Sequence, residues 1–278
     1  MATIPNKVKD RLVSNIRKFQ NVLSLAKSRD VNESDTVTII TDILCDIFGF
    51  DKYSEITSEY AIRSTYVDIA IKIGGTLQML IEVKAIGLDL KESHTKQAID
   101  YAANEGIDWV VLTNGIYWQI YKISFGKPIS QELVLQIDFP ALNPKNKNDL
   151  ENLFLITKEG LKKSALGEYQ IQRQVLSRFF IGAVLMSESV LHVIRRELRH
   201  MSPNVKIDIE QIKVVLAQEV IKREVLEGKK ADEAKRKVSR VTNRILRKTA
   251  KETVEETSTI CNLGNLGTVA SKNGNPQK

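Results

Sequence analysis

The amino-acid sequence predicts an α/β fold in the first half of the chain and an all-helical region in the second half. Apolar residues alternate with period two in several short runs, most clearly at 67–73 and 78–84 on either side of a Gly-Gly pair, and this alternation is typical of half-buried strands. After a polar, turn-rich stretch at 143–148, apolar residues recur only at helical spacing. We therefore expect a sheet domain with a helical appendage.

An amphipathic helix comes first, and the elements after it follow in the order αβββαββ with one more strand at the end. Helices are expected at 5–28, 32–49 and 91–105, strands at 53–62, 67–73, 78–84, 109–113, 116–123 and 133–139, and further helices at 149–161, 169–186, 188–200, 209–227 and 231–251. The expected domains are a nuclease-like sheet domain at 1–142, a basic helical domain at 143–256 and a disordered tail at 257–278.

Composition and charge narrow the functional classes. We find neither an apolar run long enough to span a membrane nor a signal peptide, and Cys45 in an apolar helix is expected to be a reduced core thiol. A cytoplasmic protein fits these features. Residues 1–145 carry 16 Lys and Arg against 18 Asp and Glu, whereas residues 146–278 carry 25 against 16. The basic second half indicates either a polyanionic partner or solvated helix faces.

Three ionisable groups interrupt the otherwise apolar hairpin, namely Asp68, Glu82 and Lys84. A two-residue Gly-Gly turn would point the two carboxylates to opposite faces of the sheet, because a one-residue slip reverses every side chain of one strand relative to the other. A three-residue loop at 74–76 would set them on one face, roughly 5 Å apart, with the lysine beside them. We favour the three-residue loop.

Two carboxylates on adjacent strands suit a hard cation such as Mg²⁺, and the carbonyl of Val83 is a candidate third ligand. A lysine beside them can orient an attacking water while the cation neutralises charge on a phosphate. This combination indicates metal-assisted phosphodiester hydrolysis. The alternative is a surface hairpin with modest ion pairs, and the same acid-x-Lys spacing recurs in Lys-rich helical stretches. The hairpin alone leaves both interpretations open.

The flanking helices favour the first interpretation. Asn32-Glu33 opens the helix before the sheet, and Gln97 and Tyr101 lie one turn apart on the helix after it. With these residues, the chain resembles the PD-(D/E)xK nuclease superfamily and, within it, the N-terminal nuclease domain of the restriction subunit of type I restriction enzymes. The resemblance spans about 32–123, where the order αβββαβ is the core of that family.

The resemblance implies a restriction-endonuclease-like fold and a set of site residues. These are Asp68 and Glu82 as metal-binding acids, Lys84 as the motif lysine, Glu33 as the auxiliary acid, and Gln97 and Tyr101 as the QxxxY motif, which supports the site or contacts substrate. Two departures accompany it: Val67 stands where a proline often precedes the first acid, and Asp35 competes with Glu33. His94 is expected to be a surface or capping residue.

The sequence contains no Gly-x₄-Gly-Lys-Ser/Thr phosphate loop, so we do not expect a complete translocating restriction subunit. The leading hypothesis is a Mg²⁺-dependent endonuclease, with Mn²⁺ able to substitute, that cuts DNA in bacterial restriction or anti-phage defence. It would act alone, as a homo-oligomer, or with a separate recognition or motor subunit. The alternatives are a non-catalytic nucleic-acid-binding or assembly subunit and an RNA-cleaving nuclease.

Four arginines in the basic half recur at steps of 4, 4 and 3, so they share one helix face; they are Arg236, Arg240, Arg244 and Arg247. Three uses of this face remain open: a solvated surface, a contact surface for the phosphate backbone, or a docking site for another subunit.

Overall fold

The protein is represented by a computed structural model that describes residues 3–62, 65–126 and 128–244. The chain divides into two compact units, Met1–Ile171 and Gln172–Lys278. The first unit contains a mixed six-stranded sheet with helices, and the described part of the second is helical. The predicted fold class, α/β followed by a helical C-terminal region, is confirmed.

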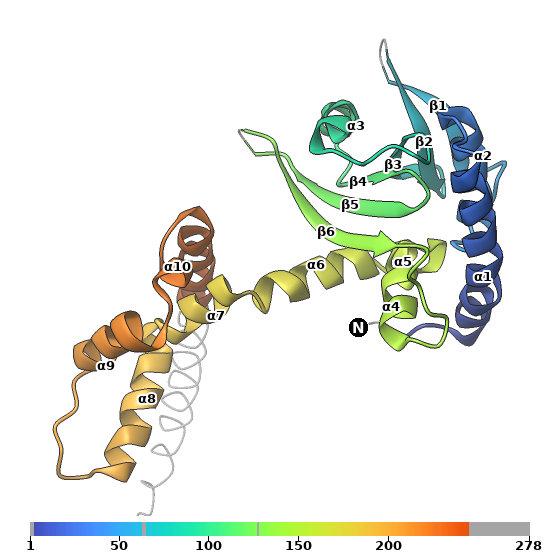
Figure 1. Cartoon of the computed structure of the whole chain (residues 1–278). Helices are drawn as coiled ribbons and strands as arrows, with labels where there is room; N and C mark the ends of the chain where they lie inside the picture. The colour runs from blue at the N-terminus through green and yellow to red at the C-terminus, as the bar shows by residue number, and fades with distance from the viewer. Residues whose placement is uncertain (1–2, 63–64, 127, 245–278) are drawn as a thin grey trace, which may run out of the picture. The chain divides into compact units, whose positions relative to one another are not determined.

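The first unit contains the elements expected from the sequence, with small shifts at their ends. They are α1 (Asn6–Ser28), α2 (Glu33–Asp46), β1 (Ile56–Ile62), β2 (Thr65–Ile73), β3 (Thr76–Val83), α3 (Glu92–Glu105), β4 (Trp109–Thr113), β5 (Tyr117–Ser124), β6 (Ser130–Asp138), α4 (Lys147–Leu155), α5 (Lys158–Lys162) and most of α6 (Ala165–Val175) (Figure 1).

The strands lie side by side in sequence order, β1-β2-β3-β4-β5-β6. All neighbours are antiparallel except β3 and β4, which are parallel. Parallel neighbours need a crossover connection, and α3 supplies it. The crossover leaves β3 in the middle of the sheet, so side chains at its carboxyl end are enclosed by both neighbouring strands.

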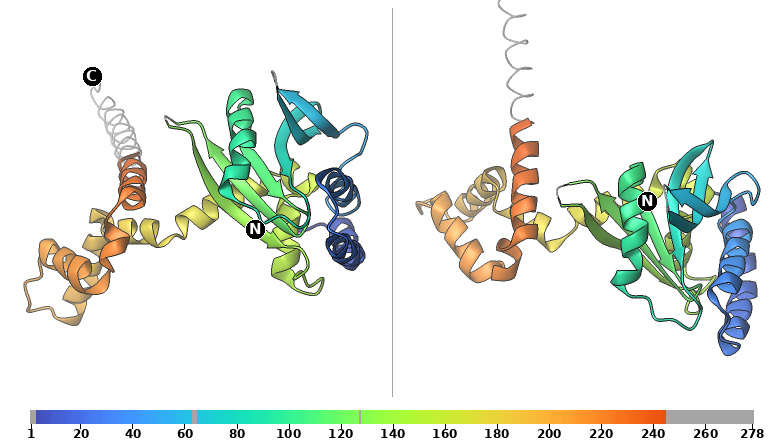
Figure 2. Two further views of the ribbon diagram at one scale, coloured as in Figure 1. Left: turned by 45° about the horizontal axis from the view of Figure 1, so that its top comes forward. Right: turned by 90° about the horizontal axis from the view of Figure 1, so that it is seen from above.

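Each face of the sheet carries its own apolar core. One face packs against α1, α2 and α4, and the other packs against α3 through Ala98, Tyr101 and Ala102. Figures 1 and 2 show α1 and α2 along one side of the sheet and α3 along the other. Alternate residues of β2 and β3 serve the two cores: Ile69 and Ile81 face α1 and α2, whereas Ala70 and Leu80 face α3. Val67 also belongs to the core that faces α3, so the regular alternation of β2 holds only from Ile69 onward.

Helices α1 and α2 form where the periodicity predicts them. The buried stripe of α1 is Val8, Leu12, Ile16, Phe19, Leu23 and Ala26, at the spacing of one helix face. Asn32 begins α2 as its N-cap, because its side-chain oxygen accepts a hydrogen bond from the Asp35 N–H at 2.9 Å. Cys45 is an unpaired, half-buried thiol on α2, and burial raises its pKa, as expected for a reduced core cysteine.

The turn between β2 and β3 differs from the prediction. Ile73 pairs with Thr76, so the loop has two residues, Gly74 and Gly75. Both glycines have positive φ, 59° and 79°, as a two-residue hairpin turn with the right-handed twist of the strands requires. The predicted three-residue loop at 74–76 is wrong.

A β-bulge nevertheless restores the predicted register. Lys72 pairs with Leu77 near the turn, but Ile71 pairs with Met79 one step further on, so Gln78 is an extra residue in β3. The extra residue shifts all later pairs of β2 with β3 by one position, and a three-residue loop would have produced the same shift. Without Gln78, the two-residue turn would lead directly into the same pairing.

Residues 143–171 pack with the first unit, although the sequence placed a domain boundary at 142/143. The polar stretch at 143–148 caps a helix: Asn146 accepts a hydrogen bond from the Asn148 N–H at the start of α4. The apolar side of α4 joins the core that faces α1, and Arg11 on α1 donates to both carboxylate oxygens of Glu159 on α5, at 2.9 and 2.6 Å. The compact units divide instead at 171/172.

The second unit is built from short helices: α7 (Arg178–Leu185), α8 (Glu188–Met201), α9 (Ile209–Val215), the π-helical turn η1 (Leu216–Val220), α10 (Arg223–Leu226) and helical residues 229–244. The long helices predicted at 169–186 and 209–227 are each broken. Ser177 interrupts the first by capping α7, and Ile221 takes an extended conformation in the second. The predicted tail at 257–278 lies outside the described residues. Among the residues with a described structure, no helix has the length and apolarity to cross a membrane.

Candidate active site

The candidate site lies where β2 and β3 run side by side beyond the bulge. Ile69 pairs with Ile81, so Asp68 and Glu82 are the next residues along the two strands, and their carboxylates repel each other. One carboxylate oxygen of Asp68, Oδ2, accepts a hydrogen bond from the backbone N–H of Val83 at 2.7 Å. This bond fixes the Asp68 side chain against β3. The two carboxylates therefore lie close together, and the repulsion from Asp68 contributes to the raised pKa of Glu82.

Glu82 and Lys84 form a close ion pair in a largely enclosed position. The Lys84 ammonium lies 2.8 Å from Oε1 of Glu82, and the side chains of Lys84 and Glu82 are 16% and 8% exposed. The backbone N–H of Lys84 donates to the carbonyl of Thr113 on β4 at 2.8 Å. This bond continues the β3–β4 ladder past the end of β3, so Lys84 keeps the strand direction that places it on the same face as Glu82.

Glu33 approaches the same lysine from α2. Its Oε2 atom lies 3.5 Å from the Lys84 ammonium, and its side chain is 49% exposed. Among the described residues, Glu33 is the first-turn acid of α2 that contacts Lys84. The competing candidate, Asp35, is exposed, and its N–H is held by the Asn32 cap. The structure therefore brings Glu33, Asp68, Glu82 and Lys84 together.

Burial and mutual repulsion shape the charge of the site. Burial raises the pKa of Asp68 and of Glu82 above ordinary carboxyl values, since hydrogen bonds from Val83 and Lys84 offset the desolvation only in part. Burial acts in the opposite sense on Lys84, but its hydrogen bond to Glu82 and the surrounding negative charges outweigh it and raise the lysine pKa. Burial therefore disfavours the charged forms of the two carboxylates, whereas the neighbouring acids favour the protonated form of Lys84.

Glu59 is a neighbouring acid that the sequence interpretation missed. The register of β1 with β2 places it opposite Asp68, between the pairs Ser58–Ile69 and Tyr60–Val67. Its φ is +48°, an uncommon conformation for a residue with a Cβ atom, and its charge contributes to the raised pKa of Asp68. Neither the alternation of residues 53–62 nor any motif singles it out.

The segment after Lys84 is anchored by Asn114, to which the sequence interpretation gave no role in the site. The Asn114 amide donates to the carbonyls of Leu88 and Ile86, at 2.9 and 3.5 Å. Its oxygen accepts from the N–H groups of Ile116 and Tyr117. Because Asn114 is buried and uses both ends of its side chain, it ties the β4–β5 turn to the segment that leaves the site.

The helix motif is described only in part. Tyr101 is 6% exposed and belongs to the core that faces α3. Gln97 lies on α3, but its side chain is outside what the structure describes. His94 caps α3: its Nδ1 accepts a hydrogen bond from the Lys91 N–H at 3.2 Å, in agreement with the capping role expected for it.

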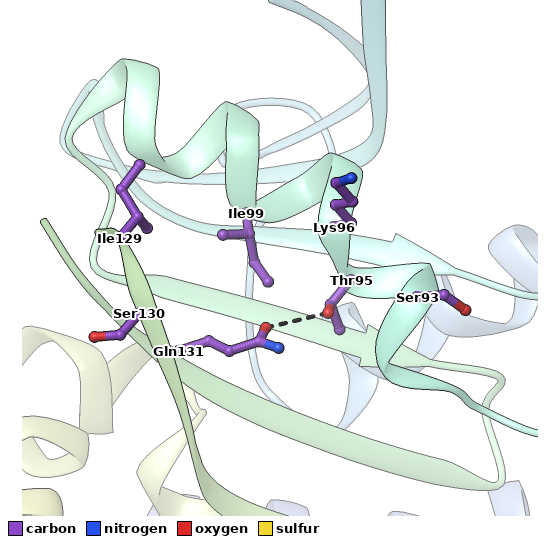
Figure 3. Close-up of a pocket in the computed structure, with 7 residues that line it drawn as sticks. All are labelled: Ser93, Thr95, Lys96, Ile99, Ile129, Ser130 and Gln131. Atoms are coloured by element: carbon purple, nitrogen blue, oxygen red, sulfur yellow. Dashed lines mark hydrogen bonds between the residues drawn. The ribbon is translucent and has the colours of Figure 1, made fainter. Parts of the chain in front are cut away.

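A hollow of about 370 Å³ lies on α3 next to the start of β6 (Figure 3). It is lined by Ser93, Thr95, Lys96, Ile99, Ile129, Ser130 and Gln131. Thr95 donates to Gln131 across it, with the two oxygens 3.2 Å apart. Among the residues whose side chains the structure describes, the lining includes none of those predicted from the sequence to act in catalysis.

The donor set at the carboxylate site fits Mg²⁺. Asp68 and Glu82 supply hard oxygen ligands, and a cation held between them would offset the burial that raises the pKa of both. In the described part of the chain, no group of three His, Cys, Asp or Glu side chains is arranged to hold a metal ion. Mg²⁺ commonly binds through one or two carboxylates, with water and substrate phosphate completing its shell, so two carboxylates are sufficient.

Three of the four predicted arginines lie in the described part of the second unit. Arg236, Arg240 and Arg244 are exposed on helical residues 229–244, while Ala231 and Ala234 of the same helix are buried. Arg247 lies outside the described residues. The helix therefore has buried small residues near its start and exposed arginines further along, and Val241, which follows Arg240, is exposed as well.

Comparison with known proteins bears on this site. Residues 40–136 match the family model described as the N terminus of the type I restriction enzyme R protein. The match covers about a third of the chain and includes Asp68, Glu82 and Lys84, but it begins after Glu33. None of the curated proteins and none of the solved structures matches the chain. The sheet and α3 are thus similar to a restriction-enzyme N-terminal domain, and the six-stranded mixed sheet is consistent with a restriction-endonuclease-like fold.

Proposed function

We propose that the protein is a Mg²⁺-dependent nuclease of the PD-(D/E)xK type that hydrolyses phosphodiester bonds of DNA in bacterial restriction or anti-phage defence. The observation that carries the proposal is the close grouping of Asp68, Glu82 and Lys84 beside the carboxyl end of β3. The similarity of residues 40–136 to a restriction-enzyme N terminus supports the choice of DNA.

The roles of the side chains follow from their chemistry. Asp68 and Glu82 would hold the cation, which when bound would neutralise charge at the phosphate and make a water more nucleophilic. Val83 contributes its N–H, which positions Asp68, and its carbonyl is a candidate further ligand. Lys84 donates a hydrogen bond to the attacking water or to a phosphate oxygen. Hydrolysis forms one P–O bond from water and breaks one ester P–O bond, whose oxygen leaves with a proton.

Other residues act around this centre. Gln97 and Tyr101 on α3 support the site or contact substrate. The exposed arginines at 236, 240 and 244 would bind phosphates without reading the sequence, and Arg247 would extend the same face. Mn²⁺ would replace Mg²⁺, and a second copy or a separate recognition subunit would supply specificity.

The experiment that tests the proposal is a cleavage panel of double-stranded, single-stranded and modified DNA and of RNA, each with Mg²⁺, Mn²⁺ or EDTA. We expect metal-dependent cleavage of DNA by the wild-type chain and none by folded Lys84→Ala. Cleavage of RNA alone would change the assigned substrate. Salt-dependent DNA binding without cleavage under any condition would favour a non-catalytic binding subunit.

A further inference from the structure

We propose that Glu33 is a positioning residue that takes over Lys84 when Glu82 binds the cation. The inference rests on the proposed nuclease function and concerns the same site. In the structure the Lys84 ammonium lies between two carboxylates, 2.8 Å from Glu82 and 3.5 Å from Glu33. The closer contact uses Oε1 of the acid that is also needed to hold the cation.

This arrangement creates a conflict between two positive charges. A divalent cation held by Asp68 and Glu82 would lie near the ammonium, and positive charges close together repel strongly where little water separates them. Lys84 is only 16% exposed, so water screens this repulsion weakly. Glu82 must therefore give up much of its contact with Lys84 before it binds the cation well.

Glu33 is placed to receive the lysine without a change in the backbone. It lies in the first turn of α2, where the Asn32 cap and the hydrogen bond from Thr36 Oγ1 to the Asn32 carbonyl fix the helix end. A contact of 3.5 Å needs to shorten by less than about 1 Å to become a charge-assisted hydrogen bond. Because the Glu33 side chain is half-exposed, it has room for this movement.

The exchange has a distinctive consequence. If Glu33 is neutralised, Lys84 stays on Glu82 and competes with the cation. If Lys84 is removed, the competition disappears and Glu33 no longer matters. The effect of Glu33 on cation affinity should therefore depend on Lys84, which a double-mutant cycle measures directly.

The test is calorimetric titration of the full chain with Ca²⁺, a divalent cation that binds oxygen ligands, at neutral pH. Four proteins form the cycle: wild type, Glu33→Gln, Lys84→Met and the double variant. We expect Glu33→Gln to weaken Ca²⁺ binding about tenfold, which corresponds to about 1.4 kcal/mol, and Lys84→Met to strengthen it. In the Lys84→Met background, Glu33→Gln should change affinity less than twofold.

Two controls identify the site and the residue. Asp68→Asn should abolish the titrated binding, and Asp35→Asn, in the same turn of α2 as Glu33, should leave it unchanged. Thermal melts in EDTA confirm that each variant is folded.

Equal weakening by Glu33→Gln in both backgrounds would overturn the inference, because Glu33 would then act on the cation directly. No weakening in either background would also overturn it. If the wild-type chain cleaves DNA with Mg²⁺ but the cycle shows no coupling, the inference alone fails. If the wild type neither binds Ca²⁺ nor cleaves, both proposals fail.

Discussion

Replacement of Asp68 by Asn should stabilise the cation-free protein while abolishing cleavage. Asn is nearly isosteric with Asp, and its side-chain oxygen can still accept the hydrogen bond from the Val83 N–H, which is 2.7 Å long in the structure. What changes is the charge. The substitution removes a buried carboxylate that is repelled by Glu33 and Glu59 and is only partly compensated by Lys84.

The sign of the effect follows from the pKa. Burial raises the pKa of Asp68 above its ordinary value of 3.8, so the folded state binds this proton more tightly than the unfolded state does. Stability therefore falls as pH rises through the interval between 3.8 and the raised folded value. Above that interval Asp68 is charged at a net cost to the folded state, and below 3.8 the cost is absent.

The expected effect of Asp68→Asn on the free energy of unfolding is the difference between two opposing contributions. Asn forgoes the charge-assisted part of the Val83 hydrogen bond, about 1 kcal/mol, and the attraction to Lys84. It avoids the larger cost of desolvation and repulsion. A net gain of about 1 kcal/mol would raise the melting temperature by roughly 2–4 °C in a unit of this size.

The assay is a set of thermal melts of wild type and Asp68→Asn in EDTA at pH 7 and pH 4, repeated at pH 7 with Mg²⁺. We expect the Asp68→Asn variant to melt higher than wild type at pH 7, the gap to narrow at pH 4, and Mg²⁺ to stabilise only the wild type. A variant that melts lower than wild type at pH 7, by an amount independent of pH, would refute the electrostatic reasoning.

Three further predictions concern the bulge, the anchor after the site and the basic helix. Deletion of Gln78 should leave Mg²⁺-dependent cleavage within a fewfold of wild type, because the pairing beyond the bulge is preserved; loss of cleavage by a folded deletion variant would contradict this. Asn114→Ala should lower the free energy of unfolding by about 1–3 kcal/mol, measured with denaturant, and reduce kcat more than it raises KM. Replacement of Arg236, Arg240 and Arg244 by Ala should weaken DNA binding at every sequence and reduce the slope of log Kd against log salt by roughly 3; an unchanged slope would assign the basic face another use.

The strands, the helices of the first unit and the closeness of the two carboxylates could be predicted because each depends on local periodicity. The buried stripe of α1 and the Asn32 cap of α2 are readable from residue spacing alone. The site register was predicted with the wrong turn, since the sequence does not distinguish a three-residue loop from a Gly-Gly turn followed by a bulge. A three-residue loop and a Gly-Gly turn followed by a bulge each add one residue to the second strand before Ile71 pairs with Met79.

What could not be predicted depends on contacts between distant segments. Glu59 joins the site only through the register of β1 with β2. Asn114 anchors the segment after Lys84 only because the β4–β5 turn folds next to it. The two units divide at 171/172 and not at the predicted 142/143, because the apolar side of α4 packs into a core that includes the distant helix α1. The polar composition at 143–148 had favoured a linker there.

The central claim is that Asp68, Glu82 and Lys84 form one metal-dependent hydrolytic centre. The most direct measurement is single-turnover cleavage of a double-stranded DNA in Mg²⁺ by wild type and by Asp68→Asn, with folding of both verified by thermal melts. We expect wild type to cleave the DNA and EDTA to stop this cleavage. The folded variant should cleave at least about a thousandfold more slowly, which corresponds to a loss of about 4 kcal/mol in transition-state stabilisation. Equal cleavage by the two proteins would contradict it.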